Sequence, residues 1–183
     1  MNARAHLKEA SAELHAQVDN AFANYALNTR DGYQRFLQAH AWALSRIEPT
    51  VEREGIADVL PDWAERRRYQ AIGEDLASLG ATAPGPAPVA LELDASSLWG
   101  VAYVLEGSRL GARYLSRAVQ GAEFDEAGPP LAYLTHGQEA GLWPRFLKRL
   151  ESTSDSLDQA RMLDGVRWCF SVFLEAARLD PGR

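Results

Sequence analysis

The sequence predicts an all-α protein in which residues 1–183 form one domain, a bundle of helices. In successive segments, apolar residues recur three, four or seven positions apart, which places them on one face of an α-helix. No segment keeps the strict alternation of apolar and polar residues that marks a half-buried strand. With 183 residues, 46% of them hydrophobic, the chain is long enough to bury one substantial core.

Two long helices are predicted near the N-terminus, over residues 3–23 and 33–53. The apolar stripe of the first consists of Leu7, Leu14, Val18 and Phe22. The stripe of the second consists of Phe36, Leu37, Ala41, Leu44 and Ile47. Residues 28–32 interrupt the pattern and supply an N-cap for the second helix. That helix is expected to end near Pro49 or a little beyond.

A third helix is predicted to start at residues 60–63 and to stop at Gly80. Residues 81–88 hold three prolines and a glycine, so they form a loop. Residues 94–97 then cap the most apolar helix of the chain, which runs from residue 98 to about residue 119.

Three more helices are predicted beyond the Gly-Pro-Pro segment at residues 128–130. A short one covers residues 131–136, and a second begins at about Gln138. The last helix is expected to have Asp155 or Ser156 as its N-cap.

Composition argues against several classes of partner. The formal net charge of -6 gives no electrostatic support for binding nucleic acid or an anionic membrane surface. The one cysteine, Cys169, cannot form an internal disulfide or a thiolate cluster, so a reducing cytoplasm suits the chain. No stretch resembles a signal peptide or approaches the roughly 20 apolar residues of a membrane span. We therefore expect a cytoplasmic protein.

His15 is the first candidate for chemistry. Lys8 lies seven residues earlier, about 10 Å away on the same helix face. A neutral imidazole can coordinate heme iron, and a lysine at that separation can meet a propionate at the porphyrin edge. The spacing alone is more simply explained by a solvated histidine beside the apolar stripe.

Gly107 and Gly111 are the second candidate, because they lie four residues apart inside the most apolar helix. Each glycine should lower the stability of the helix by about 1 kcal/mol relative to alanine. Two glycines on one face let a flat ligand approach the backbone, or let another helix pack closely. The spacing does not separate these two explanations.

Charged residues near these glycines have several interpretations. Glu106 lies in an apolar helix and needs a partner, which Arg109 or Arg113 can supply. Either arginine can instead reach an anionic ligand. Arg145, with Lys148 and Arg149 in the same basic cluster, can meet a second propionate or can form an ordinary solvated face. The remaining histidines lack the spacing of a zinc or di-iron site; they are His6, His40 and His136.

Four segments resemble the bacterial heme oxygenases of the biliverdin-producing, phytochrome-associated type. Residues 7–15 (LKEASAELH) are similar to the family's opening helix, and residues 103–111 (YVLEGSRLG) match its distal-helix signature. Residues 75–80 and 137–147 also resemble family segments. The resemblance spans nearly the whole chain and implies a helical bundle of the heme oxygenase type.

The resemblance implies a role for each candidate residue. His15 would be the proximal ligand of the heme iron, and Lys8 would contact a propionate. Gly107, Ser108 and Gly111 would form the catalytic distal wall. Other residues implied to bind the heme are Tyr103, Arg113 and Arg145.

The resemblance also implies the reaction, in which heme is both cofactor and substrate. Dioxygen activated at the iron opens the ring, which releases carbon monoxide, iron and biliverdin. The sequence shows no flavin or nicotinamide fingerprint and no iron–sulfur cysteines, so a ferredoxin or flavoprotein reductase is expected to supply electrons. A phytochrome is a candidate recipient of the bilin.

Two positions depart from better-known members of the family. Ser108 stands where animal and pathogen enzymes have an aspartate, and a hydroxyl can hold water but supplies no charge. Ala112 stands where many members have a glycine. Two other functions remain open, namely a heme carrier or sensor of the same fold and a helical interaction module without heme.

Overall fold

The computed structural model describes residues 3–121, 124 and 128–179, and within these ranges it contains helices and no strand. The all-α prediction is confirmed. The helices are α1 (Ala3–Phe22), α2 (Arg30–Arg53), α3 (Ile56–Val59), α4 (Trp63–Arg66), α5 (Tyr69–Ser78), α6 (Ala95–Gln120), α7 (Ala132–Thr135), α8 (Leu142–Thr153), the 3-10 turn η1 (Ser154–Ser156) and α9 (Gln159–Arg178).

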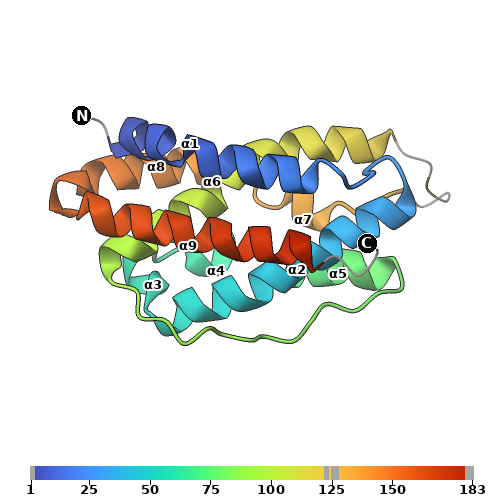
Figure 1. The fold of residues 1–183 in the computed structure, drawn as a ribbon, viewed down its shortest axis with the longest axis horizontal. Coiled ribbons are helices and arrows are strands. Elements are labelled where there is room, and N and C mark those ends of the chain that lie inside the picture. The colour runs from blue at the N-terminus through green and yellow to red at the C-terminus, as the bar shows by residue number, and fades with distance from the viewer. Residues whose placement is uncertain (1–2, 122–123, 125–127, 180–183) are drawn as a thin grey trace.

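The C-terminal helix α9 organises the bundle, because α1, α2 and α6 all pack against it (Figure 1). Its closest neighbour is α6, and the two helices touch through glycines. A Cβ atom on Gly100 would lie 1.9 Å from the Met162 carbonyl oxygen, and one on Gly165 would lie 2.0 Å from the Ser97 carbonyl oxygen. Only glycine fits at either position, so this pair sets the distance between α6 and α9.

The second helix continues through Pro49 and ends at Arg53, as the sequence predicted. A proline in a helix interior leaves the carbonyl four residues earlier without its usual donor. Here that carbonyl, on Ser45, accepts the Ala87 backbone N–H at 2.8 Å. The loop between α5 and α6, which follows the lower edge of Figure 1, therefore supplies the bond that Pro49 cannot.

The predicted third helix is divided into α4 and α5, and the short helix α3, which was not predicted, precedes them. The break before α5 is explained by Glu48 of α2, whose side chain is buried. Its two carboxylate oxygens accept the backbone N–H groups of Arg68 and Tyr69, at 2.6 and 3.1 Å. These bonds cap the start of α5, so the chain leaves the helical path at Arg67.

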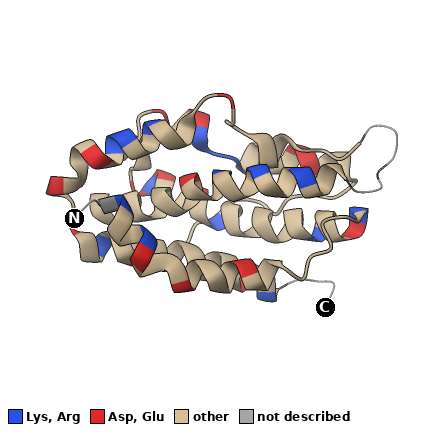
Figure 2. Ribbon diagram, turned by 90° about the horizontal axis from the view of Figure 1, so that it is seen from above, with Lys and Arg blue, Asp and Glu red and all other residues tan. Residues whose placement is uncertain are grey.

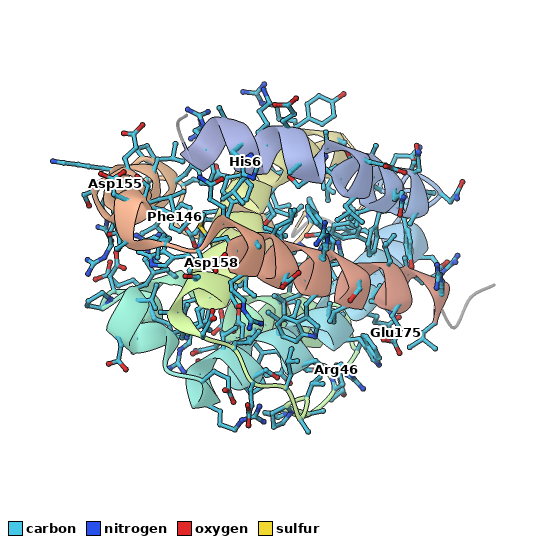
Figure 3. All side chains as sticks on the ribbon, turned by 60° about the vertical axis from the view of Figure 1, so that its left-hand side comes forward. His6, Arg46, Phe146, Asp155, Asp158 and Glu175 are labelled. Carbon is cyan, nitrogen blue, oxygen red and sulfur yellow. The ribbon has the colours of Figure 1, made fainter. Side chains whose placement is uncertain are left out.

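Two helix starts also differ from prediction. Helix α8 begins at Leu142 rather than near Gln138, after Gly141 adopts a left-handed backbone with φ of 60°. Helix α9 is capped by Asp158, whose carboxylate accepts the backbone N–H groups of Ala160 and Arg161 (Figure 3). Asp155 and Ser156 lie in η1 instead.

Both signs of charge are distributed over the helices (Figure 2). No helix within the described residues is long and apolar enough to cross a membrane. The lone Cys169 is buried, and burial raises the pKa of its thiol well above the usual range.

Candidate functional site

The second half of α6 leaves an apolar face uncovered. A Cβ atom added to Gly111 would meet nothing within 4 Å, and one on Gly107 would meet only the Trp143 ring, at 3.7 Å. Leu110 and Tyr114 on the same face are 55% and 74% exposed. Close helix packing therefore does not account for Gly107 and Gly111, in contrast to Gly100 at the crossing with α9. We call this surface, formed by Gly107, Leu110, Gly111 and Tyr114, the open face of α6.

Aromatic rings border the open face at its N-terminal end. Trp143 of α8 lies over Gly107, stacks on Phe146 with ring centroids 5.7 Å apart, and contacts Tyr103 at 5.9 Å. Phe146 itself is fully buried and points into the bundle (Figure 3). Burial raises the pKa of Tyr103, and the positive charge of Arg4 partly offsets this rise. Tyr103 is therefore near the start of α1.

The side chain of His15 on α1 is 63% exposed and oriented by two neighbours. Its Nδ1 lies 3.0 Å from a carboxylate oxygen of Asp19, one turn later on the helix. Its ring meets Phe170 of α9 edge to face, with centroids 6.1 Å apart. A carboxylate at Nδ1 favours the tautomer with the proton on that nitrogen, which leaves the lone pair of Nε2 for a metal. Lys8 is exposed on the same helix.

Glu106 has the buried partner that its position requires. Its carboxylate accepts bonds from Arg66 at 2.6 Å and from Arg109 at 2.8 and 3.0 Å, and all three side chains are buried. Arg109 therefore serves the fold, while Arg113 is exposed. Arg66, which reaches Glu106 from α4, was not among the partners predicted for this carboxylate.

Arg145 is also engaged, but at the surface. Its guanidinium donates to Asp62 at 2.7 Å and to Glu65 at 3.1 Å. Hydrogen bonds from Arg66, and then from Arg145, lower the pKa of Asp62 to about 2. The structure thus joins α8 to α4 through Arg145 and does not bring this residue to Lys8 or His15.

Ser108 borders the open face and has a buried cation behind it. Its hydroxyl donates to the Leu105 carbonyl at 2.7 Å and accepts from the Arg68 guanidinium at 2.8 Å. Ser108 is exposed, whereas Arg68 is only 2% exposed. Sequence reasoning missed Arg68, because three consecutive arginines at 66–68 suggest a solvated helix start. Their contacts with α6 form only in the folded structure.

His40 lies in an aromatic cluster beyond Arg68. Its Nδ1 is 2.8 Å from the Tyr133 hydroxyl, and its ring packs on Phe22, Phe36 and Phe173. Burial, and to a lesser degree the charge of Arg68, lowers the pKa of His40 from 6.5 to about 3. The imidazole is therefore neutral in the folded protein at ordinary pH.

This shift predicts acid sensitivity. Below pH 6.5 the unfolded chain binds a proton at His40 that the folded chain does not bind until about pH 3. The free energy of unfolding should therefore fall with pH across this window, by up to roughly 1.4 kcal/mol per pH unit from this residue. The free energy of unfolding can be measured by urea unfolding at several pH values. Its slope against pH should be smaller for His40→Gln than for the wild type. His6→Gln is the matched control, and an equal slope in both variants would contradict the assignment.

Neither of two cavities formed by described residues is lined by His15, Gly107 or Gly111. One of about 390 Å³ lies between α1 and α9, lined by Gln17, Asn20, Ala21, Leu174, Ala177 and Arg178. The other, of about 230 Å³, lies beside Glu48 and Pro49. The described residues include no group of three or more histidine, cysteine, aspartate or glutamate side chains that could hold a metal ion.

Comparisons with known proteins bear on the family and the fold of the chain. No family model matches the chain. A heme oxygenase of Xanthomonas campestris pv. campestris is 30% identical over 149 residues, which cover 78% of this chain and 87% of that protein. The heme oxygenase PigA of Pseudomonas aeruginosa is 31% identical over 138 residues, which cover 73% of this chain and 69% of that protein.

Solved structures extend the similarity to the fold. The NO- and CO-bound heme oxygenase of Neisseria meningitidis superposes with a TM-score of 0.71 at 22% identity, covering all of this chain and 93% of that one. The heme oxygenase of Leptospira interrogans superposes with a TM-score of 0.70 at 18% identity, covering 97% of this chain and 98% of that one. The resemblance predicted from the sequence is confirmed, and the chain belongs to the heme oxygenase family.

Proposed function

We propose that this chain binds one heme against the open face of α6 and cleaves it to biliverdin, carbon monoxide and iron. The observation that carries the proposal is the pair Gly107 and Gly111, which cost helix stability and yet pack against no backbone. A flat macrocycle would cover Leu110 and Tyr114, two of the three large apolar side chains that are exposed in the described residues. The family's activity supports the same conclusion.

The residues around this face fit a heme. His15 is the proposed axial ligand, and Asp19 holds its tautomer and orientation through Nδ1. Lys8, Tyr103 and Arg113 are the proposed partners of the propionates. Arg145 would have to leave Asp62 and Glu65 to join them, so we omit it from the set.

When bound, the heme supplies the iron that activates dioxygen. The protein's part is positioning. Backbone at Gly107 and Gly111 lets the ring lie close to α6, where larger side chains would prevent it. Ser108 holds water beside the ring with a hydroxyl already oriented by Arg68.

The proposal includes partners and a location. The sequence has no flavin or nicotinamide fingerprint, and the proposed electron donor is a ferredoxin or flavoprotein reductase. A phytochrome is the proposed recipient of the bilin, and the reaction takes place in the cytoplasm.

A spectroscopic titration tests the function. The purified chain is mixed with hemin and then with ascorbate under air, and absorption is followed. An enzyme gives a Soret band that decays into a bilin spectrum, whereas a heme carrier or sensor keeps a stable band over the same period. A chain that only binds protein partners gives no saturable Soret band, which would exclude both heme functions.

Asp19→Asn tests the support of the axial ligand. The amide cannot accept as strong a bond from Nδ1–H, and changes at such positions cost about 10–100-fold in metal affinity. Because Asp19 is 67% exposed, we expect a loss near the lower limit, about tenfold, in heme affinity. Asp164→Asn, which alters an equally exposed pair on α9, is the control. Identical affinities for wild type and Asp19→Asn would show that the carboxylate does not support the ligand.

A further inference from the structure

Arg68 is a buried cation that lacks a carboxylate partner. It is 2% exposed, and within the described part of the chain no carboxylate oxygen lies within ion-pair distance of its guanidinium. Its side chain donates to the Leu105 carbonyl at 3.0 Å and to Ser108 at 2.8 Å, and lies over the Tyr133 ring at 5.2 Å. The buried Glu48 interacts electrostatically with Arg68, but its two carboxylate oxygens accept the backbone N–H groups of Arg68 and Tyr69 and not the guanidinium.

Arg66 shows how the fold treats a comparable residue. It lies two positions earlier and is 3% exposed, yet it is held by Asp62 and by Glu106, at 2.7 and 2.6 Å. Burying a guanidinium without an anion is unfavourable, so proteins normally pair such a charge. Among the described residues Arg68 has no such direct carboxylate partner, so an anion bound near its guanidinium would be stabilised.

The route from Arg68 to the open face of α6 is Ser108. The serine follows Gly107 directly and is exposed, so it lies at the edge of the face where the heme is proposed to lie. At present its hydrogen points to the Leu105 carbonyl, and its oxygen accepts from Arg68. Rotation about the Cβ–Oγ bond would turn this hydrogen toward a ligand without breaking the bond from Arg68. A donated bond at the oxygen makes the hydroxyl a stronger donor.

We propose that Arg68 and Ser108 together stabilise a small anion on the α6 side of the bound heme. Ser108 donates its hydrogen to the anion, and Arg68 is a positioning residue that orients the hydroxyl and balances the added negative charge. The pair supplies the charge that a serine alone lacks at this position. The inference rests on the proposed function, since it requires a heme at the open face.

Fluoride binding to the ferric heme protein tests this pair. We expect Ser108→Ala to weaken fluoride binding about tenfold or more, which is the range for a hydrogen bond to a charged group. Arg68→Lys keeps the charge but loses the forked donor geometry, so it should give a smaller loss. Imidazole, a neutral ligand, should bind all variants alike, because a purely structural defect would weaken both ligands.

Arg66→Lys is the matched control, since it alters an equally buried arginine that is already paired. Equal fluoride affinities in wild type, Ser108→Ala and Arg68→Lys would overturn the proposal, and so would an equal loss in Arg66→Lys and Arg68→Lys. Each variant is first titrated with hemin. If the wild type forms no heme complex, the proposed function fails, whereas a normal complex with unchanged fluoride binding refutes only the role of Arg68 and Ser108.

Discussion

Replacement of His15 with alanine is expected to abolish ring opening, with at least about a 100-fold loss of biliverdin formation. Removing a residue that only supports a metal ligand costs about 10–100-fold, so loss of the ligand itself should cost more. The fold should survive, because the imidazole is 63% exposed and its polar contact is with exposed Asp19. The measurements are the Soret maximum of the hemin complex and bilin formation with ascorbate.

His6→Ala is the control, because His6 lies on the same helix and outside the proposed heme site. Added imidazole should restore part of the activity of His15→Ala by filling the vacant axial position. Product formation at the wild-type rate in His15→Ala would refute the assignment of His15, even if the protein still bound heme.

The sequence predicted the helices whose signals are local. The spacing of apolar residues located α1, α2 and α6, and Asp94 caps α6 as expected by accepting the Ser97 backbone N–H. Predictions were wrong where a distant residue decides the outcome. Glu48 ends the helical path before α5 and so divides the expected third helix. The contact from Ala87 that lets α2 pass through Pro49 was also not predicted, although the end of that helix was. Glu48 and Ala87 both lie far along the sequence from the segments that they contact, so a local pattern of residues does not reveal them.

The same limit applies to the site. The spacing of Gly107 and Gly111 placed them on one face of α6, but it could not show whether another helix covered that face. The structure separates the two cases, because backbone crowds Gly100 and nothing approaches Gly111. The bond from Arg68 to Ser108 joins residues 40 positions apart, so no sequence pattern in one chain could have identified it.

The glycines provide the second large prediction, in which two substitutions on one helix have opposite effects. In the heme-free protein, Gly111→Ala should stabilise α6 by about 1 kcal/mol and raise the melting temperature by roughly 2–4 °C, because the new methyl group meets nothing. Gly100→Ala should lower it, since the methyl group would lie 1.9 Å from the Met162 carbonyl oxygen. Overpacking of this kind typically costs about 1–3 kcal/mol.

A larger side chain at Gly111 should prevent heme binding even though it leaves the fold intact. Gly111→Leu fills the open face with a branched side chain, so we expect a normally folded protein that no longer gives a saturable Soret band with hemin. The proposed ring would lie where that side chain projects, while the folded chain has free space for it. Far-ultraviolet circular dichroism and thermal melting establish that the variant is folded. If folded Gly111→Leu bound hemin as tightly as the wild type, the heme would have to bind elsewhere, and the stability cost of Gly111 would need another explanation.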